Sequence, residues 1–281
     1  MFEEIREAAA KGKAVTALCA MTGLNRAGYY RFRWPRQGIP VEMELRDEMQ
    51  KIALESPSYG YRRITAELQR RNFAVNHKRV LRMMRQDNLL CVRRHVFMTT
   101  TDSRHSLPVY PNLAREMEPT AVNQLWVADI TYIRLREEFV YLSVVLDAYS
   151  RRVIGWALGR TLGAALALAA LRMALAVRRP SPGLVHHSDR GVQYASHEYT
   201  ELLKAHEITI SMSRNGNPYD NAACESFVKT LKYDEVYRNE YRDFADAQTS
   251  IGQFLEVVYN RQRLHSALGY RAPAEFEKGT Q

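Results

Sequence analysis

The sequence predicts an α/β domain in the second half of the chain, preceded by all-α units in the first half. Between residues 124 and 212, short runs rich in Val, Ile, Tyr and Trp alternate with helical patterns, which is typical of a sheet covered by helices. Before residue 95, apolar residues recur at helical spacing. The chain has 281 residues, of which 46% are hydrophobic, so we expect two or three domains.

Basic residues gather in one segment of the first half. The chain has 40 Lys and Arg against 31 Asp and Glu, a net charge of +9, which indicates a polyanionic partner such as nucleic acid. Between Tyr59 and His95, ten basic residues stand against two acidic ones, so almost the whole net charge can be assigned there. The three scattered cysteines exclude a disulfide framework and favour a reducing cytoplasm. We expect neither a secretion signal nor a membrane span.

Residues 1–34 carry the pattern of a helix-turn-helix. A short apolar helix, a turn that contains Gly23 and a second helix capped by Asn25 follow one another. The second helix carries Arg26 and Arg31, which are candidate DNA contacts. A helical hairpin that only packs would show the same pattern, so both interpretations stay open. The prolines within residues 35–40 then predict a linker.

Residues 41–95 are predicted to form a second, strongly basic helical domain that binds DNA. Helices are expected over residues 42–54, 61–71 and 77–86. In the third helix the apolar side chains point inward and the basic ones are available outward, which makes it the predicted recognition helix. The candidate phosphate contacts of this domain are Arg62, Arg63, Lys78, Arg79, Arg82 and Arg85. Residues 96–119 are polar and irregular, and we interpret them as an interdomain linker.

Residues 120–237 predict the element order β-β-β-α-β-α-β-α. The expected strands cover residues 125–133, 139–147, 152–158, 184–188 and 208–212, and the expected helices cover 161–178, 197–205 and a final block from about 219 past 232. Short links make the first three strands an antiparallel meander. This order matches the ribonuclease H-like fold, a mixed five-stranded sheet with helices on both faces. Residues 238–281 are expected to form a helical C-terminal segment.

Three acidic residues are predicted to meet at the rim of this sheet. The first and fourth strands are neighbours in this topology, so Asp129 and Asp189 can face one another although sixty positions separate them. Glu225 comes from the last helix and shares a helical face with Lys229 and Lys232. Carboxylate oxygens suit Mg²⁺, with Mn²⁺ as a substitute. Two such ions can activate a water or a 3′-hydroxyl for attack at phosphorus.

Three other residues near this rim have alternative roles. His186 and His187 are adjacent on a strand and point to opposite faces, which disfavours a zinc site. One of them is expected to pack and the other to lie near the scissile phosphate. Asp147, at the end of the second strand, either binds metal or caps the following turn, and the sequence leaves both interpretations open.

Three blocks of the sequence resemble the signature of a known family. They are Trp-Val-Ala-Asp-Ile-Thr-Tyr at 126–132, His-Ser-Asp-Arg-Gly-x-Gln-Tyr at 187–194 and Asn-Pro-Tyr-Asp-Asn-Ala-x-x-Glu-Ser-Phe at 217–227. With 35 residues between Asp189 and Glu225, the blocks resemble those of bacterial insertion-sequence transposases in the retroviral-integrase superfamily. The most similar group is the OrfB-type transposase of insertion-sequence family three. Residues 58–64 and 259–273 also resemble this family, so the likeness covers nearly the whole chain.

The resemblance implies a DDE transposase that acts on double-stranded DNA in the bacterial nucleoid. Such an enzyme nicks the terminal inverted repeats of a mobile element, joins a 3′-hydroxyl to target DNA, and works as an oligomer, at least a dimer, that holds two ends. By this likeness Asp129, Asp189 and Glu225 are catalytic ligands of two Mg²⁺ ions, and Lys229 and Lys232 contact DNA. The family commonly uses an upstream-frame partner or a frameshift fusion, and the sequence leaves open whether this chain does so.

Two other functions fit the same residues. The chain could be a DNA-binding regulator whose ribonuclease H-like domain is inactive. It could also be a metal-dependent nuclease that cuts DNA without joining it, because the same metal ions serve a water or a 3′-hydroxyl.

Overall fold

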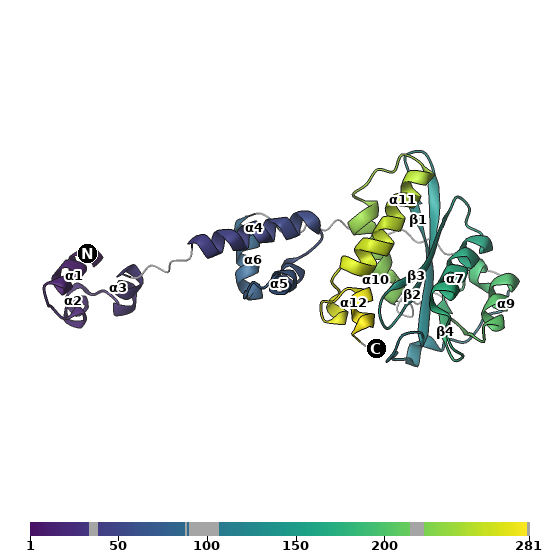
Figure 1. Ribbon diagram of the computed structural model, residues 1–281, viewed down its shortest axis with the longest axis horizontal. Coiled ribbons are helices and arrows are strands. Elements are labelled where there is room, and N and C mark those ends of the chain that lie inside the picture. The colour runs from purple at the N-terminus through teal and green to yellow at the C-terminus, as the bar shows by residue number, and fades with distance from the viewer. Residues whose placement is uncertain (34–38, 88, 90–106, 214–221, 280–281) are drawn as a thin grey trace.

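The computed structural model describes residues 1–33, 39–87, 89, 107–213 and 222–279. In chain order, these residues form a group of three helices, a second group of three helices and a larger α/β domain (Figure 1). The mixed α/β class and the helical first half that the sequence predicts are both confirmed.

The first helical group consists of α1 (Phe2–Ala10), α2 (Val15–Thr22) and α3 (Arg26–Arg33). Gly23 ends α2 in the left-handed conformation, with φ of 66°, which a residue without a Cβ adopts at little cost. The Asn25 side chain then accepts a hydrogen bond from the Ala27 amide at 2.8 Å and caps α3. Helix α1 was not predicted, and it supplies the buried Ile5 to the small core of this group.

The second helical group consists of α4 (Ile39–Glu55), α5 (Tyr61–Arg70) and α6 (His77–Gln86). Helix α6 has the predicted bounds, and Asn76 caps it by accepting a hydrogen bond from the Lys78 amide at 2.7 Å. Pro40 does not belong to a linker, because it lies in the first turn of α4, where a missing N–H leaves no hydrogen bond unmade. Buried side chains from all three helices, such as Met49, Leu68 and Met84, form the core of this group.

The predicted linker at residues 96–119 packs against the sheet at its C-terminal end. Residues 90–106 lie outside the described part of the chain. After them, the Pro111 carbonyl accepts a hydrogen bond from the Met212 amide at 3.3 Å, and Ser211 Oγ accepts one from the Leu113 amide at 2.9 Å. A short 3-10 helix, η1 (Ala114–Glu116), follows. The polar composition of this segment hid these contacts, because they are made mainly by its backbone.

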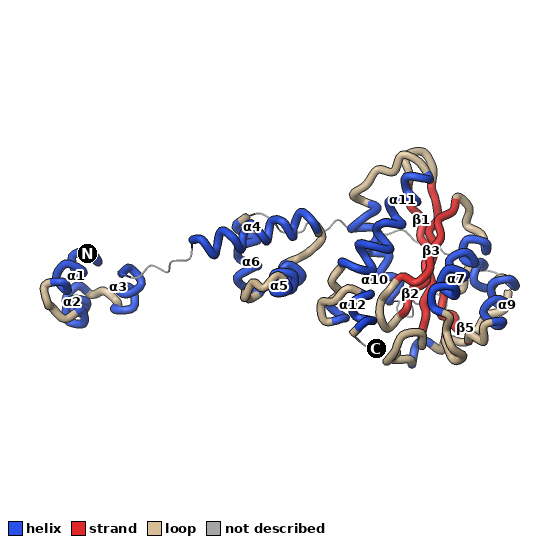
Figure 2. The backbone as a smooth tube through the Cα atoms, in the orientation of Figure 1, coloured by secondary structure: helices blue, strands red, loops and turns tan. Residues whose placement is uncertain are grey.

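The α/β domain is built on a five-stranded mixed sheet with the strand order β3-β2-β1-β4-β5. Figure 2 shows the strands in red, between helices in blue. Its strands are β1 (Leu125–Arg134), β2 (Phe139–Asp147), β3 (Val153–Gly159), β4 (Val185–Ser188) and β5 (Thr209–Met212). The first three strands form the predicted antiparallel meander, and β4 and β5 are added in parallel on the other side of β1. The prediction of a mixed five-stranded sheet is confirmed.

Helices cover both faces of this sheet. Trp126 and Ala128 face one set, which consists of α7 (Ala164–Arg178), the short α8 (Val192–Ala195) and α9 (His197–Ala205). Val127 points the opposite way, because successive strand residues alternate, and it faces α10 (Ala222–Leu231), α11 (Phe244–Gln253) and the π-helical η4 (Phe254–Gln262). The chain ends with η5 (Ser266–Leu268) and α12 (Pro273–Lys278).

The C-terminal helices belong to the core of the α/β domain. Ile251, Leu255 and Tyr259 are fully buried in the same cluster as Val127 and Val144. Residues 238–281 were predicted to form a helical C-terminal segment, and the described part of it, residues 238–279, contributes helices to the second helical layer. Sequence periodicity predicts that such helices form, but it does not say which sheet face they cover.

Candidate active site

The register between β1 and β4 brings Asp129 and Asp189 together. The two strands are parallel, and Val127 is the partner of His187. Continuing this register by two residues on each strand places Asp129 beside Asp189, on the side of the sheet that Val127 faces. The prediction that the first and fourth strands are neighbours is confirmed, and it is this pairing that joins the two carboxylates.

Asp189 is held by the tight turn that follows β4. Its Oδ1 accepts a hydrogen bond from the Gly191 amide at 2.8 Å. A Cβ on Gly191 would lie 2.9 Å from the same oxygen and 2.8 Å from Gln193 Oε1. A larger residue at position 191 would therefore require the Asp189 carboxylate and the Gln193 side chain to shift.

Asp129 lies in an unfavourable electrostatic environment. Burial raises the pKa of this carboxyl to about 7, and the negative charges of Asp189 and Glu225 add to the rise. A hydrogen bond at 2.8 Å from the Ile130 amide and the charge of Lys232 act in the opposite direction. Three carboxylates thus gather where the protein supplies too little positive charge to balance them.

Glu225 reaches this place from the first turn of α10. Cys224, Phe227 and Leu231 anchor the helix in the core on the Val127 side of the sheet. The charged face of the helix carries Glu225, whose Oε2 lies 3.7 Å from Lys229 Nζ. The first part of the third sequence block, residues 217–221, lies outside the described residues.

Lys232 continues the same face one turn further, where α10 gives way to the π-helical η3 (Lys232–Val236). Its ammonium lies 4.4 Å from the centroid of the Tyr132 ring, an attractive cation–π distance. Burial lowers the pKa of Lys232, and the Asp129 charge opposes this effect. Lys232 is therefore a partly desolvated cation close to the carboxylates.

The donor set fits a hard divalent cation by its chemistry. As the described side chains stand, no three of His, Cys, Asp or Glu are arranged to hold a metal ion. The Glu225 side chain is only partly buried, and an ion pair such as the one with Lys229 contributes little to stability. Its carboxylate can therefore turn toward the two aspartates when a cation offsets their repulsion.

The two histidines are fully buried on opposite faces of β4. His186 Nε2 lies 3.0 Å from the Tyr199 hydroxyl, and His187 Nδ1 lies 2.8 Å from Ser211 Oγ. His186 thus has the packing role expected of one histidine. His187 bonds to the neighbouring strand, and its proximity to a scissile phosphate stays a prediction.

Asp147 caps the turn after β2. One carboxylate oxygen accepts a hydrogen bond from the Asn123 amide at 2.7 Å. The other accepts from the Tyr149 and Ser150 amides, both at 3.0 Å. These bonds use both oxygens of a side chain that is fully buried, so of the two roles left open by the sequence the structure supports the cap.

Three of the four basic residues of α6 that were predicted to contact DNA form one exposed stripe. Lys78, Arg82 and Arg85 are exposed and follow one another at helical spacing. Arg79 is partly buried, and its Nη2 lies 3.7 Å from Glu42 Oε2. In α3, Arg26 is exposed, and the Arg31 side chain lies outside the described residues.

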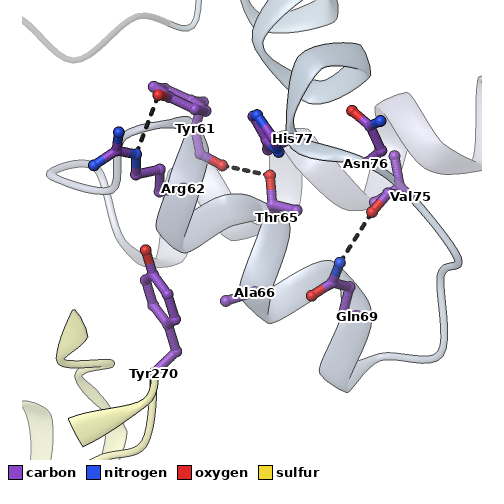
Figure 3. A pocket seen from close by; sticks show the side chains of 9 residues that line it. All are labelled: Tyr61, Arg62, Thr65, Ala66, Gln69, Val75, Asn76, His77 and Tyr270. Atoms are coloured by element: carbon purple, nitrogen blue, oxygen red, sulfur yellow. Dashed lines mark hydrogen bonds between the residues drawn. The ribbon is translucent and has the colours of Figure 1, made fainter. Parts of the chain in front are cut away.

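The two predicted contacts on α5 differ from one another. Arg62 is exposed and lines a cleft between α5, the start of α6 and Tyr270 (Figure 3). Arg63 is partly buried, and its Nε donates a hydrogen bond to the Leu264 carbonyl at 2.9 Å. Arg63 therefore contacts the C-terminal part of the chain and is not simply an exposed basic side chain.

Three residues around the site were not predicted. Tyr132 supports Lys232, Arg190 Nε donates to the Ser213 carbonyl at 2.8 Å, and the buried Arg263 forms an ion pair with Asp234. All three lie inside motifs that resemble the transposase blocks, so their positions were visible in the sequence. Their roles were not, because each depends on a partner distant in sequence.

Comparisons with known proteins agree with this architecture. The integrase core domain family matches residues 119–218, a second integrase core family matches 206–273, and an HTH-like domain family matches 40–97. The chain is 38% identical to an uncharacterized 31 kDa protein of insertion element IS600 from Shigella sonnei, covering 93% of this chain and 97% of that protein. It is 34% identical to the transposase InsF for insertion sequence IS3A from Escherichia coli, covering 94% of each.

A weaker likeness links the chain to a viral structure. The HTLV-2 integrase catalytic core domain in complex with magnesium has a TM-score of 0.45 and 15% identity, covering 57% of this chain and 99% of the viral one.

The helices in the described part of the chain include none with the length and apolar character that a membrane span requires.

Proposed function

The chain belongs to the IS3 family of insertion-sequence transposases, polynucleotidyl transferases with an integrase-type catalytic core, and we propose that it cuts the terminal inverted repeats of its element and joins their 3′ ends to target DNA. The observation that supports this proposal best is that Asp189 and Glu225 lie close enough to Asp129 for their charges to raise its pKa, although the three residues are far apart in the sequence.

In this proposal, Asp129, Asp189 and Glu225 hold two Mg²⁺ ions, and Mn²⁺ substitutes for Mg²⁺. When bound, the ions supply a Lewis acid at the phosphate and an activated oxygen nucleophile. The raised pKa of Asp129 supports a cation here, because the carboxyl is forced toward its neutral form by burial and by its two acidic neighbours. The protein's own contribution is to fix the two aspartates on the sheet and to bring Glu225 on a helix.

The DNA partner is double-stranded, at the inverted repeats and at the target. The exposed stripe Lys78, Arg82 and Arg85 would bind phosphates of the element's end, with Arg62 beside it. Lys229 and Lys232 would contact the strand at the carboxylates. Arg26, Arg31, Arg63 and Arg79 stay predicted contacts.

The transposase would act in the bacterial nucleoid as a homo-oligomer, at least a dimer, that holds two ends. An upstream-frame partner or a frameshift fusion is a further option.

The test uses a labelled duplex that carries the element's end, incubated with Mg²⁺, Mn²⁺ or EDTA and resolved on a denaturing gel. Metal-dependent strands longer than the substrate would identify joining, and Glu225→Gln should remove them while DNA binding persists. A matched control is Glu201→Gln, which removes an exposed carboxylate of α9 and should leave the products unchanged.

Other outcomes select the other functions. Shortened strands without longer products would indicate a nuclease. Tight binding without any product, under all metals, would indicate the regulator or the need for the upstream-frame partner.

A further inference from the structure

Leu264 joins the α4–α6 domain to the α/β domain. It follows η4 of the α/β domain, yet its side chain is only 2% exposed and lies in the core of the helical domain. Its amide donates a hydrogen bond to the Tyr59 hydroxyl at 2.8 Å, and its carbonyl accepts one from Arg63 Nε at 2.9 Å. Both the side chain and the backbone of this residue are thus held by a segment about two hundred positions earlier in the chain.

Two further contacts extend this junction. Arg70 of α5 forms a bidentate ion pair with Glu275 of α12, with both N–O distances at 2.9 Å. Tyr270 packs against the core of the helical domain and faces α5 across the cleft (Figure 3). An ion pair with two parallel hydrogen bonds fixes orientation as well as distance.

Arg263 connects the same junction to the carboxylate-bearing helix. It is 8% exposed, it pairs with Asp234, and its Nη1 lies 3.4 Å from Ser58 Oγ of the helical domain. Asp234 belongs to η3, which directly continues the helix of Glu225 and begins with Lys232. One buried guanidinium therefore touches the segment before α5 on one side and the extension of the active-site helix on the other.

Domains of one chain move relative to one another unless a specific interface holds them. We propose that Arg263, Leu264 and the Arg70–Glu275 pair form a positioning junction, which sets how far along the DNA the cut phosphodiester lies from the sequence bound by α6. This inference rests on the proposed function, because it takes α6 as a DNA-binding element and the carboxylates as the cutting site. The residues of the junction touch neither the reacting atoms nor the exposed stripe of α6.

The experiment maps the cut position on an end-labelled duplex at single-nucleotide resolution, with the full chain and Mg²⁺. Arg70→Glu places two like charges together at an exposed pair, and it removes no core side chain. We expect cuts at several neighbouring phosphodiesters in place of one. The double variant Arg70→Glu with Glu275→Arg restores the opposite charges and should restore the single cut.

Arg263→Gln tests the buried contact, with Arg263→Lys as the conservative variant that keeps the charge. We expect the rate of cutting at the wild-type position to fall by about 100-fold for Arg263→Gln, since displacements on the order of 1 Å have such effects on rate, while the dissociation constant for the duplex stays unchanged. Circular dichroism and the unchanged affinity show that each variant has folded.

Three results overturn the junction. The first is that Arg70→Glu still cuts at a single position and only the rate is lower. The second is that the double variant fails to restore the single cut position, which would indicate that Arg70 contacts the DNA directly. The third is a wild-type chain that makes no metal-dependent cut on any duplex, and only this result also overturns the proposed function. A sharp wild-type cut with sharp variants overturns the junction alone.

Discussion

The carboxylate site and the basic stripe of α6 differ in the sign of their charges and in how far these charges are exposed to solvent. Asp129 is held by a strand in an environment that raises its pKa to about 7, next to two other acids. Lys78, Arg82 and Arg85 stand exposed on one helix. Water screens the stripe, so its charges cost the fold little, whereas the carboxylates repel one another at close range. Chemistry depends on a few groups placed accurately, and DNA binding on many groups placed approximately.

The largest effect is expected when the Asp129 carboxylate is neutralised. Asp129→Asn removes a metal ligand and should lower cutting and joining by at least about 10³-fold, comparable with the loss of other charge-stabilising groups in active sites. It should also raise the melting temperature of the metal-free protein, because it removes a partly buried acid that neighbouring acids destabilise. A gel assay and a thermal melt measure the two effects, and a variant that is both active and less stable would contradict the assignment of Asp129.

A second change keeps all three carboxylates and moves one of them. Gly191→Ala puts a Cβ where the Asp189 carboxylate lies, so cutting should fall by about 100-fold with little change in affinity for DNA. Gly163→Ala is the matched control, since no atom lies within 4 Å of its added Cβ, and it should cut normally. Equal losses in both variants would show that accurate placement of Asp189 is not what limits the rate.

The proximity of Asp129 and Asp189 could be predicted from the sequence, because it follows from the order of the strands in the sheet. Asp129 lies on the predicted first strand and Asp189 directly follows the predicted fourth strand, and the strand order makes these two strands neighbours. The 35 residues before Glu225 then matched a known spacing. Helix α6 was predicted to its end residues because Asn76 caps it and its apolar spacing is regular.

The parts that were missed depend on contacts between distant segments. Leu264 is an ordinary apolar residue in the sequence, and nothing local shows that it enters the core of a domain two hundred positions away. Arg63 looked like its basic neighbours, yet its Nε bonds to the Leu264 carbonyl. Burial and pairing decide such roles, and composition does not contain them.

The contribution of the exposed stripe to DNA affinity should depend only on its positive charge. Reversing Arg82 and Arg85 to Glu should weaken binding at low salt and reduce the slope of log affinity against log salt by about 2, one for each lost phosphate contact. The cut position and the response to Mg²⁺ should stay the same. Arg172→Glu reverses an exposed charge on α7, away from the stripe, and serves as the control. A slope that did not change would remove α6 from the DNA interface.

The smallest expected effect is on the pH dependence of stability. It arises from two histidines that belong neither to the carboxylate site nor to the basic stripe. Burial lowers the pKa of His186 and of His265 to about 3, so the folded chain excludes protons that the unfolded chain binds below about pH 6.5. Since the unfolded state then holds more protons, the free energy of unfolding falls as pH falls from about 6.5 toward 3, by up to about 1.4 kcal/mol per pH unit for each histidine.

Denaturant titrations between pH 7 and 5 would measure this slope. His186→Gln keeps a polar side chain opposite the Tyr199 hydroxyl but cannot take up a proton, so it should lower the slope by the share of one histidine. His197→Gln, at an exposed position on α9, is the control and should leave the slope as it is in the wild type. If both variants kept the wild-type slope, His186 would have no part in the acid sensitivity.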